Sequence, residues 1–211
     1  SMDLIGQVAI VGIPPELEVA KSLIGKAVLD VNRHVETVLA KTGPVGGELR
    51  LREYSVIAGF GKTETTYKEY GCSYILDPTK VYFSPRLSTE RWRVAQKAKK
   101  GETIIDMFAG VGPFSILIAK VHKEVTVYAL DLNPIAIQYL ERNIALNKVQ
   151  SSVIPILGDS KEIMTTRLAG VAHRVIMNLP EMALNFVATA CQALRPQGGT
   201  IHYYAFKDGS R

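Results

Sequence analysis

The sequence of 211 residues predicts an α/β fold, with a doubly wound parallel sheet preceded by a small α+β domain. The first observation behind this prediction is that strand-like and helix-like runs alternate from residue 103 onward, as they do in consecutive β–α units. The second is the stretch DMFAGVGPFS, Asp106 to Ser115, which places small residues at the bend between an apolar strand and an apolar helix. Sheets of this kind bind nucleotide-like ligands at that bend.

Residues 1–85 are predicted to form the small domain. A strand-like run at 7–13 leads into Pro14-Pro15 and a helix over 16–32. The apolar positions of this helix recur at spacings of three and four and predict one buried face, made of Leu17, Ala20, Leu23, Ile24, Ala27, Val28 and Val31. Short strand-like runs follow, and we expect them to form one sheet; they lie at 35–41, 51–59, 65–71, 72–77 and 80–83.

Residues 86–211 are predicted to form the second domain. It opens with a helix over 88–100, which Ser88 or Thr89 can cap and which has Glu90 in its first turn. The strands of its sheet are expected at 103–108, 125–131, 152–157, 174–179 and 200–206. Its helices are expected at 114–122, 134–148, 160–170 and 181–194.

Composition and charge describe an ordinary globular protein, with 47% hydrophobic and 21% charged residues. The sequence holds no apolar run of ~18 residues, so it predicts no membrane span. A net charge of +5 favours an anionic partner. Cys72 and Cys191 lack metal-type spacing and are predicted to be buried free thiols, which suits a reducing cytoplasm. The four histidines show no ligand spacing either, and no metal is predicted.

The residues of the bend distinguish between classes of ligand. A phosphate-binding Walker loop ends in Gly-Lys-Ser/Thr, and no lysine stands here. A dinucleotide fingerprint reads G-x-G-x-x-G; Gly110 and Gly112 supply two of its glycines, but Ser115 takes the third place. Pro113 and Phe114 at the helix start suit adenosine or a sulfonium better than a bare pyrophosphate.

Polar side chains follow four successive strands of the predicted sheet: Asp106, Asp131, Asp159 and Asn178. Ligands bind at the carboxyl ends of such strands. Asp131, roughly 20 residues after the glycine turn, is expected to bond ribose hydroxyls, which fits both NAD and S-adenosylmethionine. Asp159 is expected to accept from an adenine amino group. Helix capping is the alternative explanation, because Asp159 can cap the helix that follows it and Asn133, just before Pro134, is a clear capping residue.

These motifs resemble the class I S-adenosylmethionine-dependent methyltransferases, which carry D-x-F-A-G-x-G-x-F at the turn, D-x-N-P after the second strand and G-D after the third. The resemblance spans about residues 101–206 and implies a Rossmann-like fold. That sheet has seven strands and five are predicted here, so C-terminal strands are expected to be missing. The resemblance implies that the donor is bound by Asp106, Phe108, Ala109, Gly110, Val111, Gly112, Pro113, Phe114, Asp131, Leu132, Asn133, Asp159, Ser160 and Asn178.

Over nearly its whole length the chain resembles the archaeal and eukaryotic tRNA (guanine-N1) methyltransferases, which act on guanosine 37 beside the anticodon. The shared motifs are GGELRLREYSVIAG, TTYKEYGC, VYFSPRLSTER, DMFAGVGPFSI, DLNP, MNLP and IHYY. The resemblance implies tRNA as the partner, a cytoplasmic location and no obligatory protein partner. Complete members carry a further N-terminal domain that holds the tRNA elbow, and we expect it to be absent here.

Guanine N1 carries a proton at neutral pH, so methylation needs a base for N1–H and a donor for the charge that develops on O6. The resemblance implies Glu90 as the base and Arg50 as the O6 donor, with Arg52 nearby in sequence as the competing choice. A helix-dipole role is the structural alternative for Glu90. The resemblance also implies roles beside the acceptor or the methyl group for Asn178, Pro180 and Tyr82.

A basic run along the helix that opens the second domain is predicted to contact RNA phosphates through Arg86, Arg91 and Arg93. Trp92 is expected to pack in the core. Two other functions remain open. One is a wyosine-pathway enzyme that methylates a tricyclic guanosine or transfers an aminocarboxypropyl group from the same donor. The other is a non-catalytic module that binds NAD or tRNA.

Overall fold

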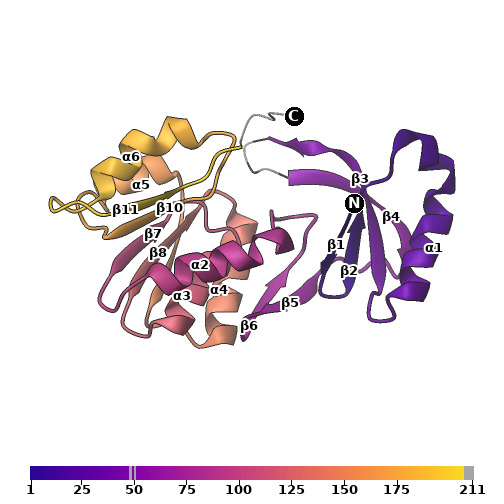
Figure 1. Cartoon of the computed structure of the whole chain (residues 1–211), viewed down its shortest axis with the longest axis horizontal. Coiled ribbons are helices and arrows are strands. Elements are labelled where there is room, and N and C mark those ends of the chain that lie inside the picture. Colours follow the sequence, from indigo (N-terminus) through magenta and orange to yellow (C-terminus); the bar gives the residue numbers. More distant parts are fainter. Residues whose placement is uncertain (48, 50, 207–211) are drawn as a thin grey trace. The chain divides into compact units, whose positions relative to one another are not determined.

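The computed structural model describes residues 1–211 except 48, 50 and 207–211. The chain divides into two compact units, Ser1–Ser88 and Thr89–Arg211 (Figure 1). In the part of the chain that the structure describes, no helix is long and apolar enough to cross a membrane. Within the same part, no group of three or more His, Cys, Asp or Glu side chains gathers as a metal site.

The first unit contains a mixed sheet in the order β1-β2-β3-β4. Its strands are β1 (Met2–Ile5), β2 (Val8–Val11), β3 (Thr37–Gly46) and β4 (Leu51–Gly59). β2 and β3 run parallel, whereas β1–β2 and β3–β4 are antiparallel pairs. A 3-10 helix, η1 (Pro15–Ala20), and helix α1 (Lys21–Val31) connect β2 to β3, and α1 packs against β3 and β4.

The prediction of a single sheet for this unit is wrong. β5 (Thr65–Glu69) and β6 (Cys72–Leu76) form a separate antiparallel hairpin. Residues 80–83 are no strand, because the amides of Lys80 and Val81 close a turn on the carbonyl of Asp77; η2 (Pro85–Leu87) follows. The sequence does not predict β1, since four residues carry no readable period and only pairing with β2 defines them.

The predicted buried face of α1 is also partly wrong. Leu23 and Val31 are 70% and 82% exposed, and Leu17 of η1 is largely exposed too. The helix instead packs through Gly25 and Val28. A Cβ on Gly25 would lie 2.9 Å from the Cβ of Ala58, so the helix approaches β4 most closely at this glycine. Apolar residues away from that point of contact face solvent.

The second unit begins within α2 (Ser88–Lys97), at the second residue of that helix. Among its described residues, five strands form a fully parallel sheet in the order β11-β10-β7-β8-β9. They are β7 (Thr103–Asp106), β8 (Thr126–Asp131), β9 (Val153–Leu157), β10 (Arg174–Met177) and β11 (Thr200–Tyr203). The predicted doubly wound parallel sheet is thus confirmed. The strand order reverses between β7 and β10, and ligands bind such sheets at that switch point.

Helices cover both faces of this sheet (Figure 1). They are α3 (Pro113–Val121) and α4 (Pro134–Asn147) on one face, and α5 (Ser160–Thr166) and α6 (Val187–Ala193) on the other. Under α5 and α6, a buried cluster joins Met107 and Met177 to Met164 and Ala190. Three predicted helices are longer than the observed ones: α2 ends at residue 97, α5 at 166, and the run 181–194 breaks into η3 (Ala183–Phe186) and α6.

Candidate active site

The turn between β7 and α3 depends on two glycines. Gly110 and Gly112 have φ angles of 56° and 90°, in the left-handed region that side chains disfavour. A Cβ on Gly112 would lie 2.4 Å from Cδ1 of Leu140 and 2.9 Å from Cδ1 of Ile116. Pro113 then occupies the first position of α3. The sequence therefore fixes a tight bend that opens at the amino end of a helix, as predicted.

Asp131, at the end of β8, holds this turn in place. Its Oδ2 accepts a hydrogen bond from the amide of Gly110 at 2.7 Å, and its Oδ1 accepts one from the amide of Asn133 at 2.9 Å. Burial raises the pKa of Asp131, while these backbone donors oppose the rise. Asn133 in turn caps α4 by accepting from the amide of Ile135. A carboxylate oxygen has two lone pairs, so Asp131 retains room to accept from a ligand hydroxyl.

Asp106, at the end of β7, is fully buried. Its Oδ2 accepts from the Ser115 hydroxyl at 2.8 Å, whereas its Oδ1 has no hydrogen-bond partner among the described residues. Burial raises the pKa of Asp106 to about 7; Ser115 opposes this and the charge of Asp131 adds to it. The sequence pattern treats Ser115 only as a missing glycine. A hydroxyl one turn into the helix after a strand-end carboxylate is the signal that could have revealed this bond.

The other donor-site candidates lie around the same sheet edge. Asp159 is exposed and caps α5 by accepting from the amide of Lys161 at 2.8 Å, so the capping alternative is what the structure contains. Ser160 is buried and donates to the carbonyl of Met107 at 2.6 Å. Asn178 directly follows β10 and is half-buried, as is Pro180. The expectation that four polar residues end four strands is confirmed; their binding roles remain predictions.

Apolar candidates line the turn. Ala109, Val111 and Phe114 are buried, whereas Leu132 is 40% exposed beside Asp131. Phe108 is half-buried and meets the ring of Phe186 edge-on, with centroids 5.0 Å apart.

Glu90 lies in the first turn of α2 and is bound by three hydrogen-bond donors. Arg93 donates from Nε to Oε2 at 2.6 Å and from Nη2 to Oε1 at 2.5 Å, and the Tyr204 hydroxyl donates to Oε1 at 2.6 Å. The pKa of Glu90 lies below its ordinary value, mainly because of Arg93, with burial opposing and Tyr204 lowering it further. The candidate base is therefore a charged carboxylate. Sequence reasoning gives no role to Tyr204, because it lies far along the chain.

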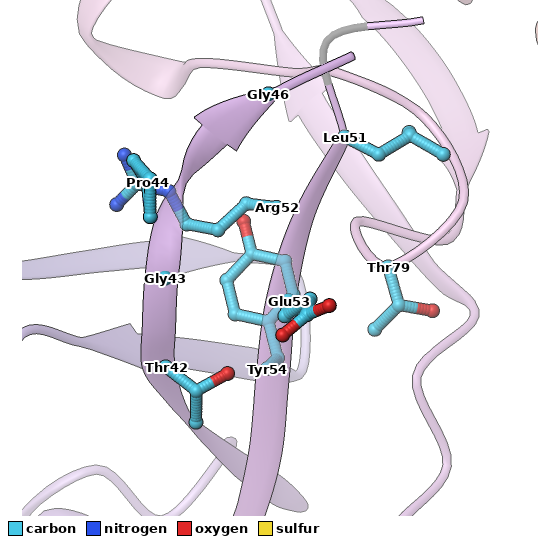
Figure 2. Close-up of a pocket in the computed structure, with 9 residues that line it drawn as sticks. All are labelled: Thr42, Gly43, Pro44, Gly46, Leu51, Arg52, Glu53, Tyr54 and Thr79. Carbon is cyan, nitrogen blue, oxygen red and sulfur yellow. The ribbon is translucent and has the colours of Figure 1, made fainter.

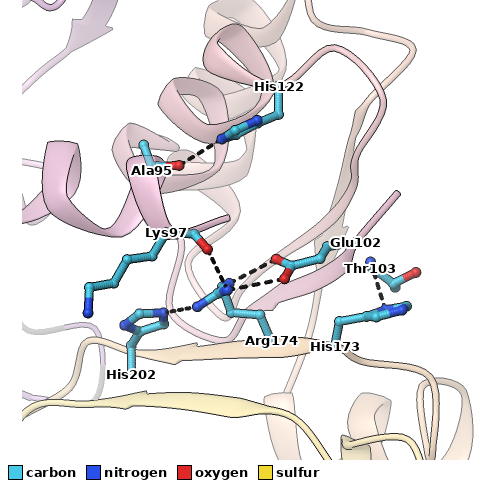
Figure 3. Close-up of polar contacts among 8 residues, drawn as sticks. All are labelled: Ala95, Lys97, Glu102, Thr103, His122, His173, Arg174 and His202. Atoms are coloured by element: carbon cyan, nitrogen blue, oxygen red, sulfur yellow. Dashed lines mark hydrogen bonds and ion pairs between the residues drawn. The ribbon is translucent and has the colours of Figure 1, made fainter. Parts of the chain in front are cut away.

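Arg174 of β10 ties the other end of α2 to the sheet (Figure 3). Its Nε and Nη2 donate to the two oxygens of Glu102 at 3.0 and 3.1 Å, and Nη2 also donates to the carbonyl of Lys97 at 2.8 Å. Its Nη1 lies 2.7 Å from Nε2 of His202 in β11. Burial, and then the charge of Arg174, lower the pKa of His202 to about 4, so its ring is neutral and accepts from the guanidinium. His122 follows α3, and its Nε2 lies 3.0 Å from the carbonyl oxygen of Ala95 in α2.

The predicted RNA contacts are placed very differently from one another. Arg91 is 1% exposed, so the prediction that it contacts RNA is wrong. Arg93 is half-exposed but engaged by Glu90. Arg86 belongs to the first unit, where its largely exposed side chain donates to Asp3 at 2.6 Å. The prediction of two buried thiols is also half wrong, since Cys72 is buried and Cys191 exposed.

The remaining acceptor-side candidates belong to the first unit. Arg50 lies outside the described residues. Tyr82 is 38% exposed in the segment after the Asp77 turn. Arg52 lines a groove of about 770 Å³ between β3, β4 and Thr79, and Figure 2 shows its side chain extending from β4 toward Pro44. The groove lies where the β3–β4 pairing shifts register between Lys41 and Val45.

The chain is similar to proteins of one family along its length. A family model described as the TRM5/TYW2 methyltransferase domain matches residues 65–210, and one described as the TYW2 N-terminal domain matches residues 1–63. The tRNA (guanine(37)-N(1))-methyltransferase Trm5b of Pyrococcus abyssi is 51% identical over 98% of this chain and 60% of its own length. The chain thus spans about three fifths of that relative.

Two further relatives bear on the substrate. The tRNA 4-demethylwyosine(37)-methyltransferase Taw21 of Saccharolobus solfataricus is 41% identical over 96% of this chain and 76% of its own length. A solved structure of aTrm5 in complex with tRNALeu is 40% identical, with a TM-score of 0.86 over 96% of this chain and 58% of that one.

Proposed function

Because the chain belongs to the TRM5/TYW2 methyltransferase family, we propose that it transfers a methyl group from S-adenosylmethionine to N1 of guanosine 37 in tRNA. The observation that carries the choice of donor is the buried Asp106 carboxyl beside the glycine turn, with one oxygen unpartnered among the described residues. A ligand with ammonium and sulfonium charges would be attracted to this carboxyl, whereas the pyrophosphate of NAD would be repelled.

The residues of the turn fit such a donor. Asp131 would accept from the ribose hydroxyls, and Asp159 from the adenine amino group, with Ser160, Asn178 and the turn residues 108–114 around them. When bound, S-adenosylmethionine supplies a methyl group that its sulfonium has already activated. The chain's own residues then have to exclude water, orient the nucleobase and take up its proton.

Glu90 is the proposed base. Since its pKa is held below the ordinary value, it stays ionised near neutral pH and can accept the N1 proton of guanine. Arg50 is the proposed donor to O6, where negative charge develops as the proton leaves. Asn178 and Pro180 would position the guanine edge, and Tyr82 would lie near the methyl group. These roles rest on the motif match and remain predictions.

Binding of tRNA is proposed to use Arg86, with exposed lysines 97, 99 and 100 adding phosphate contacts. A cytoplasmic place of action belongs to the same proposal, since the substrate is tRNA and both cysteines are free thiols.

A second candidate substrate is tRNA that carries 4-demethylwyosine at position 37. The similarity to Taw21, 41% identity over 96% of this chain, supports it as the alternative, and the higher identity to Trm5b, 51%, places it second. The donor and the base would be the same, and the acceptor would differ.

Labelled S-adenosylmethionine and three tRNAs test these proposals. They would carry guanosine, adenosine or 4-demethylwyosine at position 37, and S-adenosylhomocysteine and NAD would be compared as stabilising ligands of the folded protein. Label in the guanosine tRNA alone supports the first proposal, and label in the 4-demethylwyosine tRNA alone supports the second. Stabilisation by NAD but not by S-adenosylhomocysteine would overturn both.

A further inference from the structure

We propose that Tyr204 is the positioning residue for Glu90, and that it links the candidate base to the turn that binds the donor. This inference rests on the proposed methyl transfer, because it assigns Glu90 the role of base. Tyr204 follows directly on β11, and its hydroxyl donates to Oε1 of Glu90 at 2.6 Å. Burial, and then Glu90 itself, raise the pKa of Tyr204 well above its ordinary value. The phenol therefore keeps its proton and acts as a fixed donor.

The hydrogen bonds leave Glu90 with one open place for a proton. An ionised carboxylate has about four lone-pair positions, two on each oxygen. Tyr204 and Arg93 occupy both positions on Oε1, and Arg93 occupies one on Oε2. The remaining position is on Oε2, so the two donors together decide which oxygen faces an N1–H group. Without Tyr204, the carboxylate keeps a hydrogen-bond partner only on α2 within the part of the chain that the structure describes.

The ring of the same side chain packs on the donor turn. Its centroid lies 6.2 Å from that of Phe114, which is buried at the second position of α3, just after Gly112 and Pro113. The charge of Asp106 also acts on the Tyr204 hydroxyl. One residue thus contacts both the base and the turn. Neighbouring Tyr203 ends β11, is 41% exposed and makes none of these contacts, which makes it a matched control.

The test compares the wild type with Tyr204→Phe and Tyr203→Phe. Tyr204→Phe keeps the ring and removes the hydroxyl, so we expect a single-turnover rate about 10- to 100-fold lower. The Tyr204 bond lowers the pKa of Glu90, so its loss should move the acid limb of the rate–pH profile to higher pH. Arg93 and His202 also act on Glu90 and are unchanged in this variant. Affinity for S-adenosylhomocysteine should stay the same, and Tyr203→Phe should match the wild type.

A titration of the Glu90 carboxyl by NMR, with the signal assigned through Glu90→Gln, gives a second reading that needs no activity. The pKa of Glu90 should rise in Tyr204→Phe alone. A Tyr204→Phe protein with the wild-type rate, profile and Glu90 titration overturns the inference. A loss that only follows weaker donor binding overturns it too. A wild type without methyl transfer to any of the three tRNAs, but with the shifted titration, would instead count against the proposed function.

Discussion

Arg93 donates two hydrogen bonds to Glu90 across one turn of α2, from Nε to Oε2 and from Nη2 to Oε1. The pair is ionised, since the bond lowers the pKa of Glu90 and raises that of Arg93. A guanidinium carries five N–H donors, and two of them are used here. Arg93 is therefore first a partner of the candidate base, and any contact with RNA must use its remaining donors.

Glu90→Gln should slow methyl transfer by ~10²–10⁴-fold, because an amide cannot accept the N1 proton. Donor affinity should be preserved. Single-turnover rates and calorimetry with S-adenosylhomocysteine measure the two effects. Glu141→Gln, an exposed position on α4, is the control and should change neither. If donor affinity fell together with the rate in Glu90→Gln, the residue would be structural.

Arg86→Gln and Arg93→Gln should separate a phosphate contact from a partner of the base. Arg86→Gln should weaken tRNA binding and lower the slope of log K against log salt by about one unit. Arg93→Gln should raise the pKa of Glu90 and shift the acid limb of the rate–pH profile upward, with little change in tRNA affinity. Filter binding over a salt series and rate profiles distinguish them. A reduced salt slope in Arg93→Gln would restore its predicted role in RNA binding.

Asp106→Asn should change stability and donor binding in opposite directions. The pKa of Asp106 is about 7 in the folded protein and 3.8 in the unfolded chain, so the folded protein holds this proton more tightly. The stability that the protonated carboxyl contributes is therefore present at low pH and is lost as pH rises through about 7. At pH 8 the amide removes a buried charge, and the melting temperature of the unliganded protein should rise. Affinity for a cationic donor should fall.

Thermal shift with and without S-adenosylmethionine, whose sulfonium carries the positive charge, measures both effects of Asp106→Asn. Wild-type donor affinity should increase as pH rises through about 7, as the carboxyl ionises. A variant less stable than the wild type at pH 8 would contradict the assigned environment of Asp106.

Gly112→Ala should damage the donor turn beyond the strain of its φ angle. The new Cβ would lie 2.4 Å from Leu140, so the turn or α4 must move. Gly101→Ala is the matched control, because Gly101 also has a positive φ, 80°, and its Cβ would meet nothing within 4 Å. The control should lose only about 1–2 kcal/mol of stability, and only Gly112→Ala should also lose donor affinity. Equal losses in both variants would refute the packing argument.

Arg174→Met should destabilise the second unit by about 1–3 kcal/mol, because it leaves the partly buried Glu102 carboxylate, whose side chain is 12% exposed, without its ionic partner. Urea denaturation measures this loss. Arg195→Met, at an exposed arginine, is the control and should have little effect. An Arg174→Met protein as stable as the wild type would mean that water solvates the Glu102 carboxylate in place of Arg174, and it would contradict the prediction.

Local patterns predict the parts of the fold that local chemistry determines. The glycine turn, the strand-end carboxylates and the Asn133 cap follow from residues within a few positions of one another, and the structure places them as expected. The face of α1 does not follow from its period, because a close approach at Gly25 decides which side packs.

Contacts between distant residues are what the sequence hides. Arg91 looks like a surface arginine in a basic run, yet it is buried. Tyr204 and His202 show their roles only once β11 lies beside β10, since the register of that pairing is tertiary. For the same reason the separate β5–β6 hairpin cannot be distinguished from further strands of one sheet.

Each end of α2 is hydrogen-bonded to a residue far toward the C-terminus, which is synthesised well after the helix itself. Glu90 and Tyr204 are 114 positions apart, and Lys97 and Arg174 are 77 apart. A nascent chain can therefore form the glycine turn and α2 while the carboxylate of Glu90 is still unconstrained by β11. Contacts of such long sequence separation form late in folding. Under the proposed roles, chemical competence is thus among the last properties that the chain acquires, and a translation product that stops before β11 would have the glycine turn without the hydrogen bond from Tyr204 to the proposed base.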